Sequence, residues 1–591
     1  MRRRAFVGTG LSLVGAALLP AQTARADALS RVRPGQRGWP AAADWAKLGA
    51  SVCGRLAPGV MPDLSGTDAK ALLGNPFYIG DQPGLTESSG WLDAWRSSPS
   101  AYVVAAENTA DVVAAVDFAR RHNLRLVIKG RGHSFFGASN APDSLLLWTR
   151  RMDSVTVHDA FTPAGSKAAP VPAVSCGAGA MWLHAYQAVT VGAGRYVQGG
   201  GCTTVGVAGL VQGGGFGSFS KGFGTAAASL LEAEVVTADG KVRVVNHTQE
   251  PDLLWALKGG GGGTFGIVTR LTLATHELPQ NFGVVRLTIH AHSDDAFRRL
   301  LARFIDLYAA NLFNPHWGEQ VTAGLGNRLE VLMVFQGLTQ DDARAAWKPL
   351  LDFVSANGAD YEGQDSFSAT ALPARAFWNA DVMRRAPGAI VSDSRPGAAP
   401  TDFWWTGDGE TVGGFWNAYT SAWMPAKLLA AQNQAALVDA WFAASRLWSV
   451  AFHFNKGLAG APETAIAASR ETSTNPDMLD AFALAIIAMA GAPAFPGMPE
   501  PNLLLARFLA GRVHASMKAL RVAAPDAGAY VNECDYFQDD WQRAFWGPNY
   551  SRLARIKRRF DPDGQFTVHH GVGSEAWSAD GFTRLPQKGS R

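Results

Sequence analysis

Glycine is concentrated in three short segments of this 591-residue chain, and this clustering constrains the fold more than any other feature. The segments are residues 130–137, 199–217 and 259–266. Glycine has no Cβ, so it lets the backbone turn sharply and approach a ligand closely. The chain also holds 19 tryptophans, which supply flat apolar walls. These features predict a ligand-rich interior in a chain long enough for two or three packed domains.

The first glycine segment follows a strand, helix, strand pattern. Residues 102–104 are typical of a strand, and Thr109 can cap a helix over 110–122 in which apolar residues recur on one face. Residues 124–128 are typical of a buried strand that ends in the glycine segment. A glycine loop at the exit of such a unit favours a phosphate-bearing ligand.

Two motifs carry the strongest chemical signal. Residues 131–137 read Arg-Gly-His-Ser-Phe-Phe-Gly, and residues 199–209 read Gly-Gly-Gly-Cys-Thr-Thr-Val-Gly-Val-Ala-Gly. Unobstructed backbone N–H groups of glycine, together with nearby hydroxyls, can hold a pyrophosphate. The residues that we expect at such a cofactor by this argument are Gly130, Gly132, Ser134, Gly137, Gly200, Thr203, Thr204, Gly206, Gly209, Gly213 and Gly214, and Arg131 and Val205 lie within the same motifs.

With these two motifs the chain resembles the berberine-bridge-enzyme-like flavoproteins of the vanillyl-alcohol-oxidase and p-cresol-methylhydroxylase (PCMH) superfamily, from about residue 97 to 577. The resemblance implies an FAD cofactor held by two covalent bonds, from His133 to the flavin 8α-methyl and from Cys202 to flavin C6. Two such bonds fix the ring and should raise its oxidising power. In this family a valine three residues after the cysteine, here Val205, goes with oxidases. The resemblance therefore implies molecular oxygen as the electron acceptor and hydrogen peroxide as the product.

The third glycine segment could suggest a nicotinamide-binding motif. That motif opens a helix and needs an acidic residue about 20 positions later. Here residues 268–273 are typical of a strand instead, so the sequence argues against a nicotinamide site. The resemblance places this segment along the FAD adenosine portion, which implies contacts from Gly260, Gly263 and Ile267.

The tail contains two segments that resemble the same family. Residues 530–536 match a family segment whose tyrosine can act as a base, but Glu533 stands at that position. Either Glu533 or Tyr536 could take the substrate's proton, and Glu533 could equally be an acid paired with a neighbouring arginine. Asn549 matches an asparagine that contacts the flavin. Residues 569–570, a histidine pair, are expected in a terminal strand, where adjacent side chains point apart and do not favour a metal site.

From about residue 278 the pattern changes to longer helices alternating with strands. The helices are expected over 295–312, 342–357 and 426–447, and strands are expected over 329–335 and 448–454. In the second strand His453 could face the flavin as a substrate ligand or base, or be a core histidine with its hydrogen bonds satisfied. Plant relatives carry a polar catalytic group on a neighbouring strand, whereas residues 482–487 are apolar here.

These elements predict an α+β fold. Residues 97–276 would form a PCMH-type FAD-binding domain of two subdomains, and residues 277–528 would form an α+β substrate domain with an antiparallel sheet over the flavin. Residues 529–591 would be a berberine-bridge-type segment that returns to the FAD-binding domain. Residues 1–26 are typical of an export signal, and residues 27–96 would be an N-terminal lead-in.

The signal resembles a twin-arginine signal, which carries proteins already folded around a cofactor, although the general secretory route stays open. Its hydrophobic run is too short to span a membrane. Its removal leaves 49 basic and 50 acidic residues, a net charge of about −1 that argues against nucleic acid as a partner. Exported cysteines often form disulfides. Because the resemblance assigns Cys202 to the flavin, at most one bridge is left among Cys53, Cys176 and Cys534.

The sequence thus predicts an exported FAD-dependent oxidase that oxidises the hydroxyl of a small molecule by hydride transfer to flavin N5. The substrate would be an alcohol, a sugar or a hydroxylated secondary metabolite. The tail and residues 454–457 look closest to the isoamyl-alcohol-oxidase-like subgroup. A dehydrogenase with another electron acceptor and a flavin-binding protein with little turnover are the alternatives, since the family tyrosine is replaced by Glu533.

Overall fold

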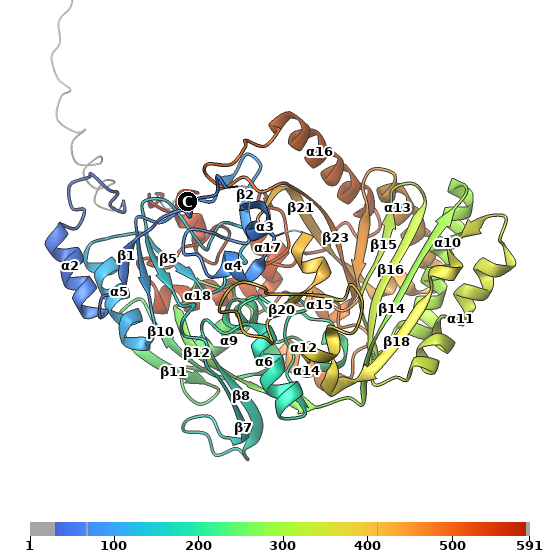
Figure 1. Cartoon of the computed structure of the whole chain (residues 1–591), viewed down its shortest axis with the longest axis horizontal. Coiled ribbons are helices and arrows are strands. Elements are labelled where there is room, and N and C mark those ends of the chain that lie inside the picture. The colour runs from blue at the N-terminus through green and yellow to red at the C-terminus, as the bar shows by residue number, and fades with distance from the viewer. Residues whose placement is uncertain (1–29, 67–68, 411, 587–591) are drawn as a thin grey trace, which may run out of the picture.

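A computed structural model describes residues 30–66, 69–410 and 412–586. The expected export signal lies outside these residues. In Figure 1 the N-terminal half, up to residue 276, lies mainly on the left of the molecule. Residues 277–528, which the sequence predicts to form the substrate domain and which we call the substrate half, lie mainly on the right. No helix within the described ranges is long and apolar enough to cross a membrane.

The first subdomain is built on a four-stranded sheet in the order β1, β4, β6, β5. Strands β4, β5 and β6 are parallel, and β1 is antiparallel at the edge. The expected helix is present as α5, but its N-cap is Asn108, whose side chain accepts from the N–H of Asp111, and not Thr109. The bounds are β1 (Leu56–Pro58), β4 (Tyr102–Ala105), α5 (Thr109–Arg121), β5 (Leu126–Lys129) and β6 (Leu145–Trp148).

The second subdomain is a five-stranded antiparallel sheet in the order β11, β10, β12, β8, β7. Its central strand β12 is the strand expected after the third glycine segment. The helices α6, α7 and α9 belong to the same subdomain. The bounds are β7 (Val155–Phe161), β8 (Val171–Gly177), α6 (Trp182–Tyr186), α7 (Val207–Gln212), β10 (Leu230–Val236), β11 (Val242–Asn246), α9 (Pro251–Leu257) and β12 (Ile267–Ala274).

The substrate half is built on a ten-stranded sheet. The helices and strands that the sequence predicts for this half are all present. Its path runs β17, β14, β16, β15, β22, β23, β21, β2, β3, and β18 pairs with β14. The bounds are β2 (Ser88–Trp91), β3 (Trp95–Arg96), β14 (Asn281–Ala291), β15 (Trp317–Gly324), β16 (Arg328–Gln336), β17 (Tyr361–Glu362), β18 (Ser368–Pro373), β21 (Gly414–Pro425), β22 (Val450–His453) and β23 (Ala481–Gly491).

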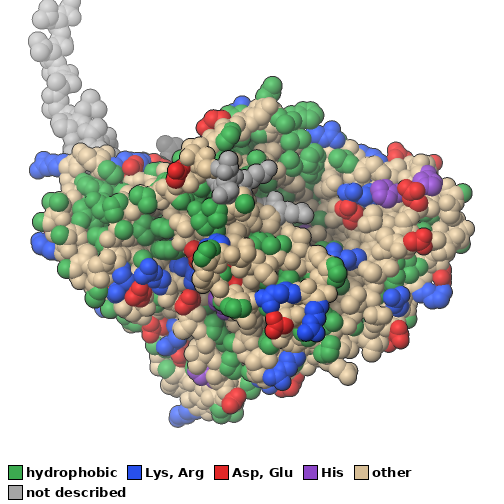
Figure 2. Space-filling model, in the orientation of Figure 1, with side chains coloured by type: hydrophobic (Ala, Val, Ile, Leu, Met, Phe, Trp, Pro, Cys, Tyr) green, Lys and Arg blue, Asp and Glu red, His purple; other side chains and the backbone are tan. Residues whose placement is uncertain are grey.

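Helices cover one face of this sheet and leave the other face toward the N-terminal half. Trp347, Trp441 and Phe452 lie fully buried between helices and sheet. The helices are α10 (Asp294–Leu307), α11 (Gln340–Ala356), α13 (Ala431–Ser445) and α16 (Leu503–Leu520). Figure 2 shows hydrophobic side chains gathered over α16, where Leu504 and Phe508 are exposed.

The lead-in and the tail both join distant parts of the fold. Strand β2 of the lead-in pairs in parallel with β21 of the substrate sheet. In the tail, α17 (Trp541–Trp546) is followed by α18 (Tyr550–Phe560), which packs on α9 of the second subdomain. The strand expected at residues 569–570 is wrong: His569 and His570 lie in a turn, because the positive φ of His570 does not fit an extended strand.

Candidate active site

A cavity of about 740 Å³ lies between the glycine segments and the tail. It is lined by two motif loops, by the third glycine segment and by residues of the tail, four parts of the chain that are far apart in sequence. Of the residues that the sequence predicted, the cavity walls include Gly130, Arg131, Gly132, His133, Ser134, Gly137, Cys202, Thr204, Val205, Gly206, Gly209, Gly263, Ile267, Glu533 and Tyr536.

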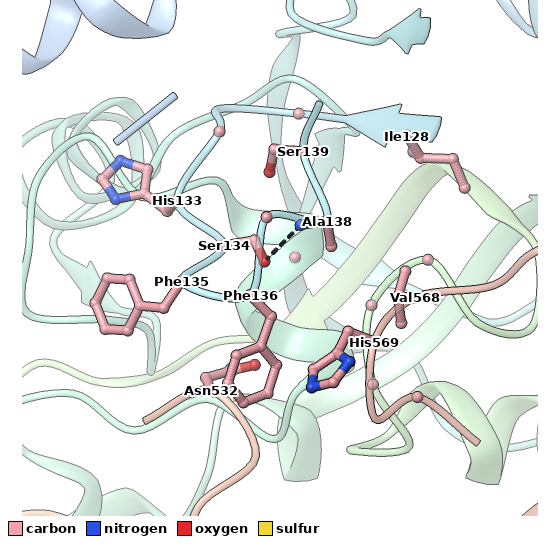
Figure 3. A pocket seen from close by; sticks show the side chains of 18 of the residues that line it. Ile128, His133, Ser134, Phe135, Phe136, Ala138, Ser139, Asn532, Val568 and His569 are labelled. Atoms are coloured by element: carbon pink, nitrogen blue, oxygen red, sulfur yellow. Dashed lines mark hydrogen bonds between the residues drawn. The ribbon is translucent and has the colours of Figure 1, made fainter. Parts of the chain in front are cut away.

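The first motif loop fits only glycine at two of its turns. Gly132 and Gly137 have positive φ angles of 84° and 70°, and a Cβ on Gly137 would lie 2.7 Å from the Trp95 ring. The N–H of Ala138, directly after Gly137, donates to the Ser134 hydroxyl at 3.3 Å, the dashed line in Figure 3. This geometry holds the loop in one shape along the cavity.

Side chains of this loop project in two directions (Figure 3). His133 and Phe135 point to one side, and Phe135 packs against Tyr419 of β21 with ring centroids 5.3 Å apart. Phe136 points to the other side, toward Asn532 and His569. The loop is therefore fastened between the substrate sheet and the tail.

His133 and Cys202 enter the cavity from separate loops. The Nε2 atom of His133 lies 3.2 Å from the Thr204 hydroxyl, two residues beyond Cys202. Burial and the positive charge of Arg131 lower the pKa of His133 to about 3, so its imidazole is neutral at ordinary pH. A neutral imidazole can act as a nucleophile.

The Cys202 thiol is open to the cavity but surrounded by protein and by three carboxyl groups. Burial and the carboxyls of Asp408, Glu319 and Glu87 raise the pKa of the thiol well above its usual range. Asp408 lines the cavity with Cys202 and accepts a hydrogen bond from the backbone N–H of Thr203 at 3.2 Å. All four cysteines are unbridged in the structure.

The sequence did not point to these three carboxyls. Glu87 lines the cavity with its carboxyl 3.9 Å from Nε2 of His133, and burial followed by the charge of Asp408 raises its pKa to about 8. Glu319 has a left-handed backbone within β15, with φ of 63°, and its carboxyl accepts from Ser218. Each lies 100 or more residues from Cys202, so no local motif could have revealed the cluster.

Of the three candidate bases, Glu533 is the one that both lines the cavity and is paired with a residue next to the substrate sheet. It forms an ion pair with Lys456, which follows β22, and not with an arginine. Burial and the charges of Glu533 and Cys202 raise the pKa of Tyr419, a residue of β21, well above its usual range. Lys456 and Tyr419 were missed by sequence reasoning because they lie outside the predicted motifs, 77 or more residues before Glu533.

Tyr536 and His453 are placed differently. Tyr536 lines the cavity, but its ring stacks on His569 with centroids 3.7 Å apart. His453 is outside the cavity walls, and its Nδ1 has no hydrogen-bond partner among the described residues. Burial and the charge of Lys456 lower the pKa of His453 well below its usual range.

The remaining predicted cofactor residues do not line the cavity, and several of them contact neighbouring segments of the chain. The carbonyl of Gly200 accepts from Tyr186, and Asn549 donates to the carbonyl of Thr474. Gly213 leaves room for Asn532, since a Cβ there would lie 2.1 Å from the Asn532 amide. The predicted residues that do not line the cavity are Gly200, Thr203, Gly213, Gly214, Gly260, Asn549 and, among the candidate bases, His453.

The cavity has the features that an FAD molecule requires. A Cβ on Gly209 would meet nothing within 4 Å, and a Cβ on Gly262 would meet only the Gly209 backbone, at 3.8 Å. Both glycines line the cavity, so the backbone can approach a ligand closely there. Nε and Nη1 of Arg131 and Oε1 of Gln212 are buried without hydrogen-bond partners among the described residues. Buried polar atoms are normally paired, and these line the cavity.

Residues 99–246 match the family described as FAD binding domain, and residues 529–573 match the family described as Berberine and berberine like. The chain is 30% identical to the VAO-type flavoprotein oxidase VAO615 of Thermothelomyces thermophilus, over 94% of this chain and 95% of that protein. It is 31% identical to the FAD-linked oxidoreductase ffsJ of Aspergillus flavipes, over 80% and 76%. The chain is a berberine-bridge-enzyme-like flavoprotein of the vanillyl-alcohol-oxidase family.

Solved structures of this flavoprotein family share the fold. The structure of MtVAO615 from Myceliophthora thermophila matches with a TM-score of 0.76 and 27% identity, over 94% of this chain and all of that one. Glucooligosaccharide oxidase from Acremonium strictum, described with a 6-S-cysteinyl, 8α-N1-histidyl FAD, matches with a TM-score of 0.64 and 19% identity, over 89% and 99%. The PCMH-type fold, the FAD-binding domain and the oxidoreductase class that the sequence predicted are thereby confirmed.

Proposed function

We propose that this flavoprotein is an exported oxidase that holds FAD through bonds to both His133 and Cys202 and oxidises a hydroxyl group of a small molecule. The observation that carries the proposal is the convergence of His133 and Cys202 on one cavity from two separate loops. The doubly linked flavin of the Acremonium oxidase, which shares the fold, supports it.

Bound FAD would supply the hydride acceptor for the substrate carbon. Glu533 is our preferred base because it lines the cavity and is held in place by Lys456. Glu533 would accept the hydroxyl proton as the substrate carbon is oxidised. Tyr536 is the second candidate, and His453, expected as a substrate ligand or base, is the third because it does not line the cavity.

The small side chain of Val205 lines the cavity, which supports molecular oxygen as the acceptor. Oxygen uptake with matching hydrogen peroxide release would distinguish an oxidase from a dehydrogenase. Carbohydrate oxidases among the structures with this fold make chitooligosaccharides and glucooligosaccharides the first substrates to try, alongside simple alcohols.

The test of the double attachment is acid denaturation of the purified protein. Yellow colour should stay in the pellet of the wild type, of His133→Ala and of Cys202→Ala, and should be released only from the double variant. Cys53→Ala, an exposed cysteine that does not line the cavity, is the matched control. Colour that washes free from the wild type would overturn the proposal.

A further inference from the structure

The surroundings of Cys202 disfavour the thiolate form that the proposed attachment needs. A thiolate is the nucleophilic form of cysteine. Three carboxyl groups surround this thiol, and with burial they raise its pKa well above the usual range. Attachment of the sulfur therefore requires a group that removes the thiol proton at the moment of bond formation.

Asp408 is the carboxyl most closely linked to the cysteine. Its charge contributes most of the three to the raised pKa of the thiol, and it accepts from the backbone N–H of Thr203, the next residue, whereas the Glu319 carboxyl accepts from Ser218. Glu319 still lies close, since a Cβ on Gly201 would be 3.5 Å from its Oε1. The Oε2 atom of Glu87 lies 3.9 Å from Nε2 of His133 and has no hydrogen-bond partner among the described residues. Of the three carboxyls, Asp408 is therefore the one bonded to the residue that follows Cys202.

Asp408 is fixed in place by the residue after the cysteine. Its Oδ2 accepts from the backbone N–H of Thr203 at 3.2 Å, and the Thr203 hydroxyl lies 3.5 Å from the same oxygen. Asp408 also lines the cavity. Because the acceptor is anchored to the neighbouring backbone, it keeps its position relative to the sulfur when a ligand enters.

We propose that Asp408 is the catalytic base that takes the proton from Cys202 when the sulfur bonds to C6 of FAD. This inference rests on the double attachment proposed above. The S–H bond and the C6–H bond break, and the S–C6 bond forms. Two electrons and two protons pass to dioxygen, the oxidant, which becomes hydrogen peroxide, so the flavin ends in its oxidised form.

The electrostatics of the site suit this role. Burial raises the pKa of Asp408 to about 6, although the hydrogen bonds from Thr203 and the interaction with the Cys202 thiol act in the opposite direction. The carboxylate is therefore ionised at neutral pH but is a better proton acceptor than an exposed aspartate. The charged and titratable groups that face it are Cys202, Glu87 and Glu319, with Arg131 beyond Glu87.

The experiment compares the full-length wild type with Asp408→Asn, Asp408→Glu and Glu319→Gln. Each protein is produced with little riboflavin, given FAD in air, and digested at intervals. Mass spectrometry then measures the flavin-linked fraction of the Cys202 peptide and of the His133 peptide separately. In Asp408→Asn we expect the rate of linkage at Cys202 to fall at least tenfold while His133 becomes linked as in the wild type.

The controls separate proton transfer from charge and packing. Glu319→Gln removes a negative charge near the thiol without removing the acceptor, so linkage at Cys202 should be as fast as in the wild type or faster. Asp408→Glu should restore much of the lost rate. In Asp408→Asn, raising the pH from 7 to 9 should restore linkage because solvent hydroxide can then remove the thiol proton.

The failure of each proposal has its own signature. Equal linkage at Cys202 in Asp408→Asn and in the wild type would overturn the role of Asp408 alone. Loss of both links in Asp408→Asn would also overturn it, since Asp408 would then serve folding or FAD binding. A wild type with no flavin on Cys202 would overturn the double attachment itself.

Discussion

At the scale of single residues, Glu87 is the clearest case of a buried group whose charge is costly. Its pKa of about 8 exceeds the ordinary value of 4.5 because of burial and the charge of Asp408, and its Oε2 has no hydrogen-bond partner among the described residues. The folded protein therefore keeps a proton that the unfolded chain has lost. The stability that this contributes is complete below pH 4.5 and is lost as the pH rises to about 8.

Glu87→Gln should remove this pH dependence. The free energy of unfolding of Glu87→Gln minus that of the wild type should increase between pH 5 and pH 8, by on the order of 1 kcal/mol per pH unit. Above pH 8 this difference should level off. Urea unfolding of the purified proteins at several pH values would measure it. Glu277→Gln, at a side chain that is 93% exposed, should show no such increase. A constant difference for Glu87→Gln would contradict the assigned pKa.

The choice between the two cavity-lining bases is also made at single residues. Glu533→Gln should leave flavin attachment intact and slow anaerobic flavin reduction by about 100-fold or more, the usual contribution of a general base. Tyr536→Phe should reduce the rate much less, since the ring is held against His569. Stopped-flow absorbance with a sugar or alcohol that reduces the wild type would measure both. An unchanged rate in Glu533→Gln would remove Glu533 from the mechanism.

At the scale of elements, glycines of the second segment serve two purposes. A Cβ on Gly217 would lie 1.8 Å from the carbonyl oxygen of Gly199, so this glycine allows two loops to touch. Gly209 in α7 has nothing within 4 Å and lines the cavity. One glycine is needed for the fold and the other for the ligand.

Gly217→Ala should therefore lower the free energy of unfolding by about 1–3 kcal/mol through overpacking. Gly209→Leu should leave stability unchanged or raise it by up to about 1 kcal/mol, since leucine favours a helix, while its side chain fills the cavity and lowers the flavin content. Urea unfolding and the ratio of flavin to protein absorbance would measure the two effects. Normal flavin content in Gly209→Leu would contradict this position for FAD.

At the scale of the whole molecule, the lead-in holds the two halves together. Its strand β2 completes the substrate sheet beside β21. The N–H of Glu87 donates to the carbonyl of Gly132 in the first motif loop, and the carbonyl of Glu87 accepts from Gly413 just before β21. The same few residues therefore contact the cofactor loop and the substrate sheet.

Deletion of residues 1–96 should produce insoluble protein because it exposes the edge of β21 and removes Glu87 from the cavity. Deletion of residues 1–29 should leave a soluble, yellow protein when produced in the cytoplasm. Gel filtration and the flavin absorbance of the soluble fraction would measure the outcome. A soluble, flavin-loaded protein lacking residues 1–96 would show that the lead-in is dispensable.

The sequence by itself determined the cofactor class and most of the local structure. Short spacings carry this information: glycines around His133 and Cys202 are required by backbone geometry within a few residues, and apolar periodicity predicted α5 and the helices of the substrate half. The motif residues could therefore be recognised without knowing what packs against them. The histidine pair was misplaced because a turn of positive φ was not recognised.

Only the tertiary structure decided which charged groups surround those motifs. Asp408 reaches Cys202 from 206 residues away, and Glu533 meets Lys456 across 77 residues. The pairing of lead-in strand β2 with β21 of the substrate sheet was also decided by the tertiary structure, because pairing between distant segments depends on how whole sheets pack. Local propensity does not encode such contacts, since burial and long-range electrostatics arise only after the chain has folded.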